Sequence, residues 1–276
     1  MITWGISANS HDAALAVFSN DGLEFASHSE RFSGIKNDPN LNTELIDYAK
    51  KWGQPDELIW YERPLVKTLR QFRAGQGIRL RENNIRNYLR SYGLHAPIKY
   101  TSHHLSHAAA GYYTSPFNQA TVVCIDSIGE FDTLTVWNGS GNKLKKIYSQ
   151  GYPNSVGLWY SALTQRVGLK PNEDEYILMG MAAYGNPSRL WNDMYEMFDY
   201  VEGADIRYKD NLHRGCKNWK PELTTEQDMF DIAAATQKTY EFTLEQILEW
   251  AKKNTKSCNL VLMGGCALNC SANHLA

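Results

Sequence analysis

The chain has 276 residues, which fits one large domain or two modest ones and is long enough to bury a substantial core. Hydrophobic residues make up 43% and charged residues 21%, which excludes a disordered tail, a collagen-like fibre and a coiled coil. With 28 basic and 30 acidic residues the net charge is −2, which argues against a nucleic-acid binder that is basic throughout.

Cysteine usage and hydropathy indicate the cellular compartment in which the protein is expected. The five cysteines are sparse and form no Cys-x-x-Cys pair, so we expect small buried thiols in a reducing compartment. The sequence does not open on a positive region followed by an apolar stretch, and it has no run of 18 apolar residues. These features predict a cytoplasmic protein that does not enter a membrane.

The first part of the chain alternates between strand and turn patterns. Apolar runs at residues 2–6, 13–18 and 23–28 predict three strands, with a hairpin turn at residues 20–22. Residues 42–50 have helical spacing, and residues 57–61 predict a fourth strand. The predicted order is therefore β-β-β-α-β.

The same order recurs later in the chain. Residues 121–125, 133–137 and 143–148 predict three strands, with a polar turn at 126–132, and helical stretches follow, including 228–254. Residues 259–263 predict a late strand of the buried parallel kind. We therefore predict an α/β fold of two similar lobes, residues 1–118 and 119–276, with a cleft suited to a nucleotide between them.

A basic insertion, extending over about residues 63–95, separates the two strand patterns. Residues 63–90 hold eight basic residues and one acidic residue, a net charge of +7 that leaves −9 for the rest of the chain. Leu65, Leu69 and Phe72 keep helical spacing, with the basic residues on other faces. The segment is either a solvated amphipathic helix pair or a surface for an anionic substrate or partner.

Two histidines form the sharpest chemical feature. His103 and His107 lie four residues apart in a predicted helix that starts after Ser102 and ends near Gly111, so their Cβ atoms would be about 5–6 Å apart on one face. Two neutral imidazoles at this spacing can bind one divalent metal, and Asp126, after the next strand, could be the third ligand. The alternative is surface or capping histidines.

Two loops add further candidates. Gly264 and Gly265 follow the late strand, where backbone could approach a ligand closely and a helix start would favour an anion, although any tight turn could use them. His11 and Asp12 lie in the first strand-loop-strand, where the imidazole could act as a general acid or base. Lys36 could contact a phosphate or carbonyl oxygen. An inert turn histidine and a solvated lysine are the alternatives.

Taken together, the motifs resemble those of the NodU/CmcH-type O-carbamoyltransferases. The stretches that carry the resemblance are Ser10 to Ala14, Glu30 to Phe32, Lys36 to Asp38, Tyr61 to Pro64, His103 to Ala108, Ile125 to Glu130, Ser155 to Tyr160, Glu175 to Gly180, Ala183 to Gly185 and Gly264 to Asn269. The resemblance implies a duplicated actin-like ATPase fold of the sugar-kinase superfamily. It also implies kinship with the proteins that transfer a threonylcarbamoyl group to tRNA.

The resemblance also implies an activity and its residues. Family members transfer a carbamoyl group from carbamoyl-adenylate, which is made from carbamoyl phosphate and ATP, to a hydroxyl of a small-molecule acceptor. By motif position, His103, His107 and Asp126 correspond to ligands of a divalent metal, for which iron or zinc suits the donor set better than magnesium. Gly264, Gly265 and Asn269 would hold the nucleotide. His11, Asp12 and Lys36 would line the transfer site.

Two departures from the family pattern stand out. Ile177 follows Glu175-Tyr176 where the family commonly has lysine, and the sequence stops at Ala276, whereas family members continue with the rest of the second lobe and an adenylate-forming domain. We therefore expect an incomplete second lobe and a second polypeptide that supplies the missing parts, without which the chain would be inactive. A shortened or decayed gene product is the alternative.

Two other functions stay open at this point. The basic segment slightly favours a threonylcarbamoyl-type transferase acting on tRNA. The stretches Tyr61 to Pro64 and Ser155 to Tyr160 fit the O-carbamoyltransferases better. A nucleic-acid partner is therefore less expected than a small-molecule acceptor. The third possibility is a non-catalytic nucleotide-binding or regulatory subunit. It is favoured by Ile177 and by the lack of the metal-binding aspartate that family members carry beyond this glycine motif.

Overall fold

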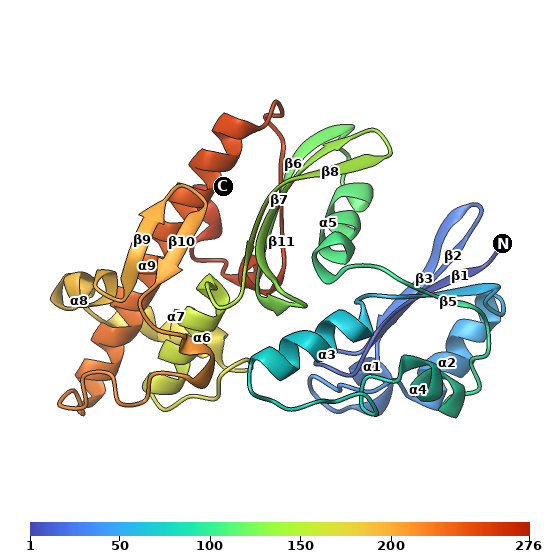
Figure 1. Ribbon diagram of the computed structural model, residues 1–276, viewed down its shortest axis with the longest axis horizontal. Coiled ribbons are helices and arrows are strands. Elements are labelled where there is room, and N and C mark those ends of the chain that lie inside the picture. The colour runs from blue at the N-terminus through green and yellow to red at the C-terminus, as the bar shows by residue number, and fades with distance from the viewer. The chain divides into compact units, whose positions relative to one another are not determined.

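The computed structural model describes residues 1–276, which form two compact units, Met1–Ser106 and His107–Ala276. Each unit contains its own mixed sheet and its own helices (Figure 1). The division falls inside helix α5 (His103–Thr114), a continuous helix whose first turn belongs to the first unit. The predicted boundary at residue 118 lies just beyond the end of this helix.

The first unit has a five-stranded sheet in the order β3-β2-β1-β4-β5. Its strands are β1 (Thr3–Ser7), β2 (Ala14–Ser19), β3 (Gly22–His28), β4 (Glu57–Trp60) and β5 (Ile98–Tyr100). Strands β1, β2 and β3 pair antiparallel, whereas β1–β4 and β4–β5 pair parallel. The helices are α1 (Glu30–Ser33), α2 (Thr43–Ala49), η1 (Lys50–Trp52), α3 (Pro64–Arg73) and α4 (Ile85–Ser91). The predicted β-β-β-α-β order is confirmed, whereas the three-residue β5 and the short helix α1 were not predicted.

Alternating side chains build the core of the first unit. Trp4 of β1 and Trp60 of β4 are fully buried, and they pack in one cluster with Leu15 of β2. Helix α2 starts where Asn42 accepts a hydrogen bond from the Leu45 amide at 2.8 Å, which satisfies one of the unpaired donors of the first turn. The apolar face of α2 then covers the sheet.

The second unit has a four-stranded sheet in the order β11-β6-β7-β8. Its strands are β6 (Gln119–Gly129), β7 (Asp132–Ser140), β8 (Lys143–Gly151) and β11 (Leu260–Met263). The first three pair antiparallel, and β11 pairs parallel to β6. In both sheets the strand order is third, second, first, fourth, so the two units share one topology. The predicted α/β fold of two similar lobes is thereby confirmed.

Helices and one hairpin complete the second unit. The α-helices are α6 (Val156–Arg166), α7 (Glu175–Met181), α8 (Trp191–Tyr195) and α9 (Glu226–Asn254). The 3₁₀ helices are η2 (Ala182–Tyr184), η3 (Pro187–Arg189), η4 (Leu212–Arg214), η5 (Gly265–Leu268) and η6 (Asn273–Leu275). Strands β9 (Phe198–Glu202) and β10 (Asp205–Tyr208) form a separate antiparallel hairpin that was not predicted. None of the helices combines the length and the apolar character needed to cross a bilayer.

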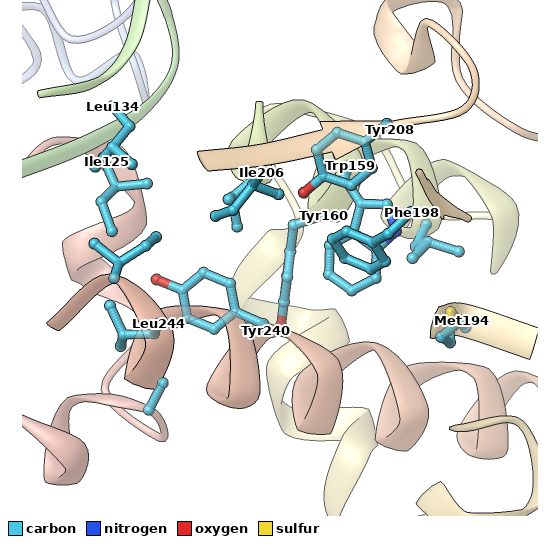
Figure 2. Packing of buried hydrophobic residues seen from close by; sticks show 14 of the residues in the cluster. Ile125, Leu134, Trp159, Tyr160, Met194, Phe198, Ile206, Tyr208, Tyr240 and Leu244 are labelled. Atoms are coloured by element: carbon cyan, nitrogen blue, oxygen red, sulfur yellow. The ribbon is translucent and has the colours of Figure 1, made fainter. Parts of the chain in front are cut away.

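Aromatic side chains pack among the aliphatic ones in the core of the second unit (Figure 2). Trp159 of α6 is fully buried, and its ring centroid lies 5.8 Å from that of Phe198. Tyr240 and Leu244 of α9 belong to the same cluster, as predicted by their place in an apolar stripe at helical spacing with Ile247 and Ala251. The hairpin contributes Phe198 and Tyr208, whose centroids are 4.8 Å apart, so the hairpin is held by this core.

Helix α3 reverses the usual amphipathic arrangement. The basic segment forms two helices, α3 and α4, but the buried residues of α3 are polar: Lys67, Thr68 and Gln71. Its apolar residues Leu65 and Phe72 are 76% and 59% exposed. Helical spacing therefore predicted the helix correctly, but not its orientation: the apolar residues are exposed and Lys67 is buried, while Arg73 stays exposed.

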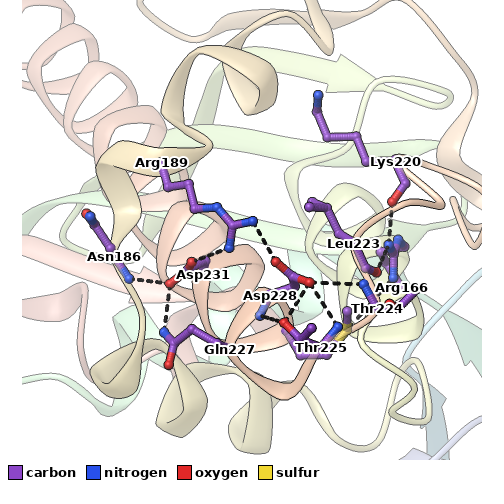
Figure 3. A network of polar contacts seen from close by, with 11 residues as sticks. Arg166, Asn186, Arg189, Lys220, Leu223, Thr224, Thr225, Gln227, Asp228 and Asp231 are labelled. Atoms are coloured by element: carbon purple, nitrogen blue, oxygen red, sulfur yellow. Dashed lines mark hydrogen bonds and ion pairs between the residues drawn. The ribbon is translucent and has the colours of Figure 1, made fainter.

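A polar network fixes the start of α9 (Figure 3). Asp228 Oδ2 accepts hydrogen bonds from the Thr225 amide at 2.9 Å and the Thr225 hydroxyl at 2.7 Å, while the Asp228 amide donates to Thr225 Oγ1. Arg189 joins Asp228 to Asp231, with N–O distances of 2.6 and 2.7 Å. This capping box begins the longest helix of the chain and attaches η3 to it.

Replacing Asp228 with asparagine is expected to make stability less dependent on pH. The hydrogen bonds from Thr225, then the Arg189 guanidinium, hold the pKa of Asp228 well below its usual range. The ionised group therefore stabilises the folded chain above its unfolded pKa of about 4, and this stabilisation is lost as pH falls toward the folded pKa. In thermal unfolding, Asp228→Asn should be less stable than the unchanged chain at pH 7, and this difference in stability should be smaller at pH 2.5. An equal difference at both pH values would contradict the prediction.

Candidate active site

The start of α5 is fixed to the end of β4. The Ser106 hydroxyl donates to the Tyr61 carbonyl at 2.8 Å, and the Thr101 amide donates to the Trp60 carbonyl at 3.1 Å. These bonds set the position of the first helical turn, in which His103 lies. Residues 103–107 are helical, as the histidine spacing predicted.

Gly111 lies within α5 rather than at its end, because the helix continues to Thr114. A Cβ atom at Gly111 would come within 2.5 Å of the Met263 side chain and 2.7 Å of the Val261 side chain. Glycine at this position therefore lets α5 approach β11 closely. The prediction that Gly111 ends the helix was wrong, because its small size serves packing inside the helix.

His103, His107 and Asp126 converge. One ligand atom from each of the three lies within 4.8 Å of the others, and all three side chains are half-buried. His107 Nε2 is 3.6 Å from Asp126 Oδ2. Two imidazole nitrogens and one carboxylate oxygen at this separation form a set that can share one divalent ion with modest adjustment, and the donor types suit iron or zinc.

The backbone holding Asp126 is not the polar turn that the sequence predicted. Strand β6 continues through Asp126 to Gly129, with a register irregularity against β7 between Ile125 and Gly129. Asp126 Oδ1 accepts a hydrogen bond from the Ser127 amide at 2.8 Å. The Ser155 hydroxyl donates to the Ser127 carbonyl at 2.6 Å, so the start of α6 is attached to this bulged strand.

Three glycines press against the same strand end. A Cβ atom at Gly157 would lie 2.8 Å from the Ser127 backbone, and one at Gly264 would lie 2.2 Å from the Ile125 carbonyl oxygen. A Cβ atom at Gly265 would lie 3.1 Å from Asp126 Oδ1. The backbone around the Asp126 carboxylate is therefore packed on both sides, which limits its movement.

Two thiols, the buried Cys124 and the half-buried Cys266, lie near this carboxylate. Burial raises the pKa of the Cys124 thiol to about 12. Burial, together with the charge of Asp126, raises the pKa of the Cys266 thiol well above its usual range. Both thiols are therefore protonated at neutral pH and add no negative charge beside Asp126.

The predicted nucleotide-binding residues form a tight turn after β11. The four-residue 3₁₀ helix η5 begins at Gly265, so the longer helix that would favour an anion does not follow. Asn269 exchanges hydrogen bonds with Gln237 of α9, at 3.0 Å from the Gln237 amide and 2.9 Å to its carbonyl. The backbone of this turn can still approach a ligand, but the Asn269 side chain has a structural partner.

The predicted transfer residues lie on two joined loops of the first unit. The Ala13 amide donates to the Asp38 carbonyl at 2.7 Å, which brings the loop of His11 beside the loop of Lys36. His11 Nδ1 is 2.9 Å from Asp12 Oδ2, and the His11 side chain is 70% exposed. This pairing leaves His11 Nε2 directed to solvent as a proton acceptor or donor.

Sequence reasoning missed one charged residue beside the histidines. Glu62 lies within the Tyr61 to Pro64 stretch, but no role was predicted for it. In the structure its Oε2 is 4.0 Å from His103 Nδ1, and its Oε1 is 2.5 Å from Lys67 Nζ. The sequence feature that could have drawn attention to it is an acidic residue directly after the strand predicted at residues 57–61.

Comparisons with known proteins place the chain among carbamoyltransferases. The family model described as carbamoyltransferase N-terminus matches residues 61–275. A Synechocystis protein, sll1178, is 31% identical over 98% of this chain, and the nodulation protein NolNO of Sinorhizobium fredii is 31% identical over 64% of it.

These comparisons cover parts of the relatives. The chain spans about half of sll1178, 51%, and 26% of NolNO. Among solved structures, a ROK family protein from Streptococcus pneumoniae has a TM-score of 0.47 and 11% identity, over 100% of this chain and 84% of that one. By the family match over residues 61–275, the chain belongs to the carbamoyltransferase N-terminus family.

Proposed function

We propose that this chain takes part in O-carbamoyl transfer, from carbamoyl-adenylate to a hydroxyl of a small-molecule acceptor. The observation that carries the proposal is the convergence of His103, His107 and Asp126 within a chain of the carbamoyltransferase N-terminus family. Carbamoyl-adenylate would come from carbamoyl phosphate and ATP, through an adenylate-forming partner.

The three converging residues would hold a divalent metal, with iron or zinc favoured by the donor set. When bound, such an ion would hold the donor's phosphate and offset the charge of the departing AMP. Asp126 contributes negative charge and a fixed oxygen, because the strand end behind it is packed on both sides. His107 lies against this carboxylate and therefore presents its imidazole at the same point.

The His11 loop supplies groups for the transfer step. The acceptor oxygen attacks the carbamoyl carbon, the bond from that carbon to the phosphate oxygen breaks, and AMP leaves with the bonding electrons. We assign His11 Nε2 as the acceptor of the hydroxyl proton, with Asp12 holding Nδ1. The Lys36 ammonium would steady the negative charge that builds on the carbamoyl oxygen.

The turn at Gly264 and Gly265 would hold the nucleotide through backbone groups. Its glycines allow close approach, and Gln237 fixes the turn through Asn269. In this assignment Asn269 acts by shaping the turn, since its side chain is already bonded to α9.

Replacing His11 with asparagine is expected to slow carbamoyl transfer by about 10²–10⁴-fold, the usual contribution of a general base. Replacing Lys36 with alanine is expected to slow it by about 10²-fold. The assay combines the chain with its adenylate-forming partner, which makes isotopically labelled carbamoyl-adenylate in situ, adds a pool of hydroxyl compounds, and follows label transfer by mass spectrometry.

The exposed His28 provides the matched control, because it lies on β3 of the same unit but outside these loops. His28→Asn should transfer at the rate of the unchanged chain. Undiminished rates in both His11→Asn and Lys36→Ala would remove these two residues from the transfer step.

A second candidate function is threonylcarbamoyl transfer to tRNA. The observation that favours it is the basic segment, in which Arg73, Arg79 and Arg81 are exposed. Arginines on a surface can contact phosphates, and such binding weakens steeply as salt is added. Strong, salt-sensitive binding of tRNA, without transfer to small hydroxyl compounds, would favour this alternative.

A further inference from the structure

An ion pair is buried next to the first histidine. Glu62 is 4% exposed and Lys67 is 9% exposed, and their Oε1 and Nζ atoms are 2.5 Å apart. Removing two charges from water costs several kcal/mol per ion, and a buried pair often contributes little net stability after that cost. This pair therefore calls for a reason beyond stability.

The orientation of α3, with apolar side chains exposed and polar side chains buried, makes the Glu62–Lys67 pair possible. The helix leaves Leu65, Leu69 and Phe72 exposed and buries Lys67 together with Thr68 and Gln71. Burial of apolar side chains is the main favourable term in folding, so exposing them gives up stabilisation. The orientation of α3 brings the Lys67 ammonium to Glu62 at the expense of that burial.

The polar face of α3 is also fixed against neighbouring backbone and side chains. Asn83 Nδ2 donates to Thr68 Oγ1 and to Gln71 Oε1, each at 2.7 Å. The Thr68 hydroxyl donates to the Pro64 carbonyl at 2.9 Å. Lys67, between these anchored residues, has a defined position, and through it the Glu62 carboxylate is oriented.

The second oxygen of Glu62 faces His103. Oε2 is 4.0 Å from His103 Nδ1, a separation that a small rotation of the imidazole ring or of the carboxylate shortens to a hydrogen bond. The Tyr61 ring lies against the His103 ring, with centroids 5.4 Å apart. The bond from Ser106 to the Tyr61 carbonyl keeps this segment in register with α5.

We propose that Glu62, oriented by Lys67, is a positioning residue for His103. Its carboxylate receives the Nδ1–H of the imidazole and so presents Nε2 as the nitrogen that binds a metal. Ligand histidines are commonly oriented in this way by a carboxylate, which also makes the imidazole a better donor. The inference rests on the proposed function only in requiring that His103 binds a metal.

The test measures metal affinity of the full chain in Glu62→Gln, by competition for Zn²⁺ or Co²⁺ with a chromophoric chelator. Loss of an orienting carboxylate typically costs 10–100-fold in affinity, so a weakening of about this size is expected. The visible spectrum of the Co²⁺ form should also change, because the histidine donor is altered. A purely structural role would not alter that spectrum.

Two further variants separate positioning from folding. Glu62→Gln alone leaves a buried ammonium unpaired, so the double variant Glu62→Gln/Lys67→Met removes the whole pair and should restore stability without restoring affinity. Glu57→Gln is the control. Glu57 lies on β4, just before Glu62 in the chain, and pairs with Lys99 at the same distance of 2.5 Å. Its metal affinity should equal that of the unchanged chain.

The outcomes are distinct for the two proposals. Weakened affinity in both Glu62 variants, with Glu57→Gln unchanged, supports the positioning role. Unchanged affinity in both Glu62 variants, while His103→Ala loses the metal, overturns the positioning role and leaves the metal site standing. A chain that binds neither metal overturns both.

Discussion

Replacing His103 or His107 with alanine is expected to weaken metal binding by more than about a hundredfold and to remove carbamoyl transfer with it. Each substitution deletes one of three side chains whose ligand atoms lie within 4.8 Å of one another. Losing even an orienting partner of a ligand costs 10–100-fold, so losing a ligand should cost at least as much. Metal competition and the transfer assay measure the two losses separately.

The control for the histidine variants is His95→Ala, because His95 is exposed and lies outside the cluster. Thermal unfolding of the apo forms shows whether each variant folds as the unchanged chain does. Metal affinity equal to that of His95→Ala in both His103→Ala and His107→Ala would exclude these histidines as ligands.

Replacing Gly264 with alanine is expected to destabilise the second unit by about 3 kcal/mol or more. Gly264 has φ 88° and ψ 170°, a region that is nearly restricted to glycine and costs other residues about 1–3 kcal/mol. The added Cβ would also lie 2.2 Å from the Ile125 carbonyl oxygen, which is backbone of the central part of β6 and cannot move aside cheaply. Urea unfolding followed by tryptophan fluorescence measures the loss.

Gly34 separates the two causes of that loss. It has φ 70° at the end of α1, but a Cβ atom there would meet nothing within 4 Å. Gly34→Ala should therefore show backbone strain alone, about 1 kcal/mol. If Gly264→Ala proved as stable as Gly34→Ala, the close approach of β11 to β6 described above would be wrong.

Much of the fold was predictable because its strands follow simple rules. The runs at residues 2–6, 13–18 and 23–28 alternate or cluster apolar residues and are separated by turn residues, so local pattern was sufficient. Helix α9 was predictable from its apolar stripe. The hairpin β9–β10 was not, since its stability comes from the ring contacts of Phe198 and Tyr208 with Trp159, which are distant in sequence.

The sequence predicted which residues form the candidate site, but not the backbone and packing contacts that hold them in place. Helical spacing placed His103 beside His107, and the end of the next apolar strand pointed to Asp126. The bulge that carries Asp126 and the packing of Gly264 against Ile125 depend on contacts between distant segments, which no local pattern encodes. The buried ion pair of Lys67 with Glu62 was not predicted, because charged side chains usually lie in solvent and the pairing depends on how α3 is oriented.

The central claim is that one divalent ion binds His103, His107 and Asp126 together. Crystals of the chain grown with Zn²⁺ would test it by anomalous diffraction at the zinc edge. The account predicts a single peak within about 2.0–2.3 Å of a nitrogen of each histidine and of an Asp126 oxygen. A peak at other residues, or no peak despite intact side-chain density for all three, would contradict it.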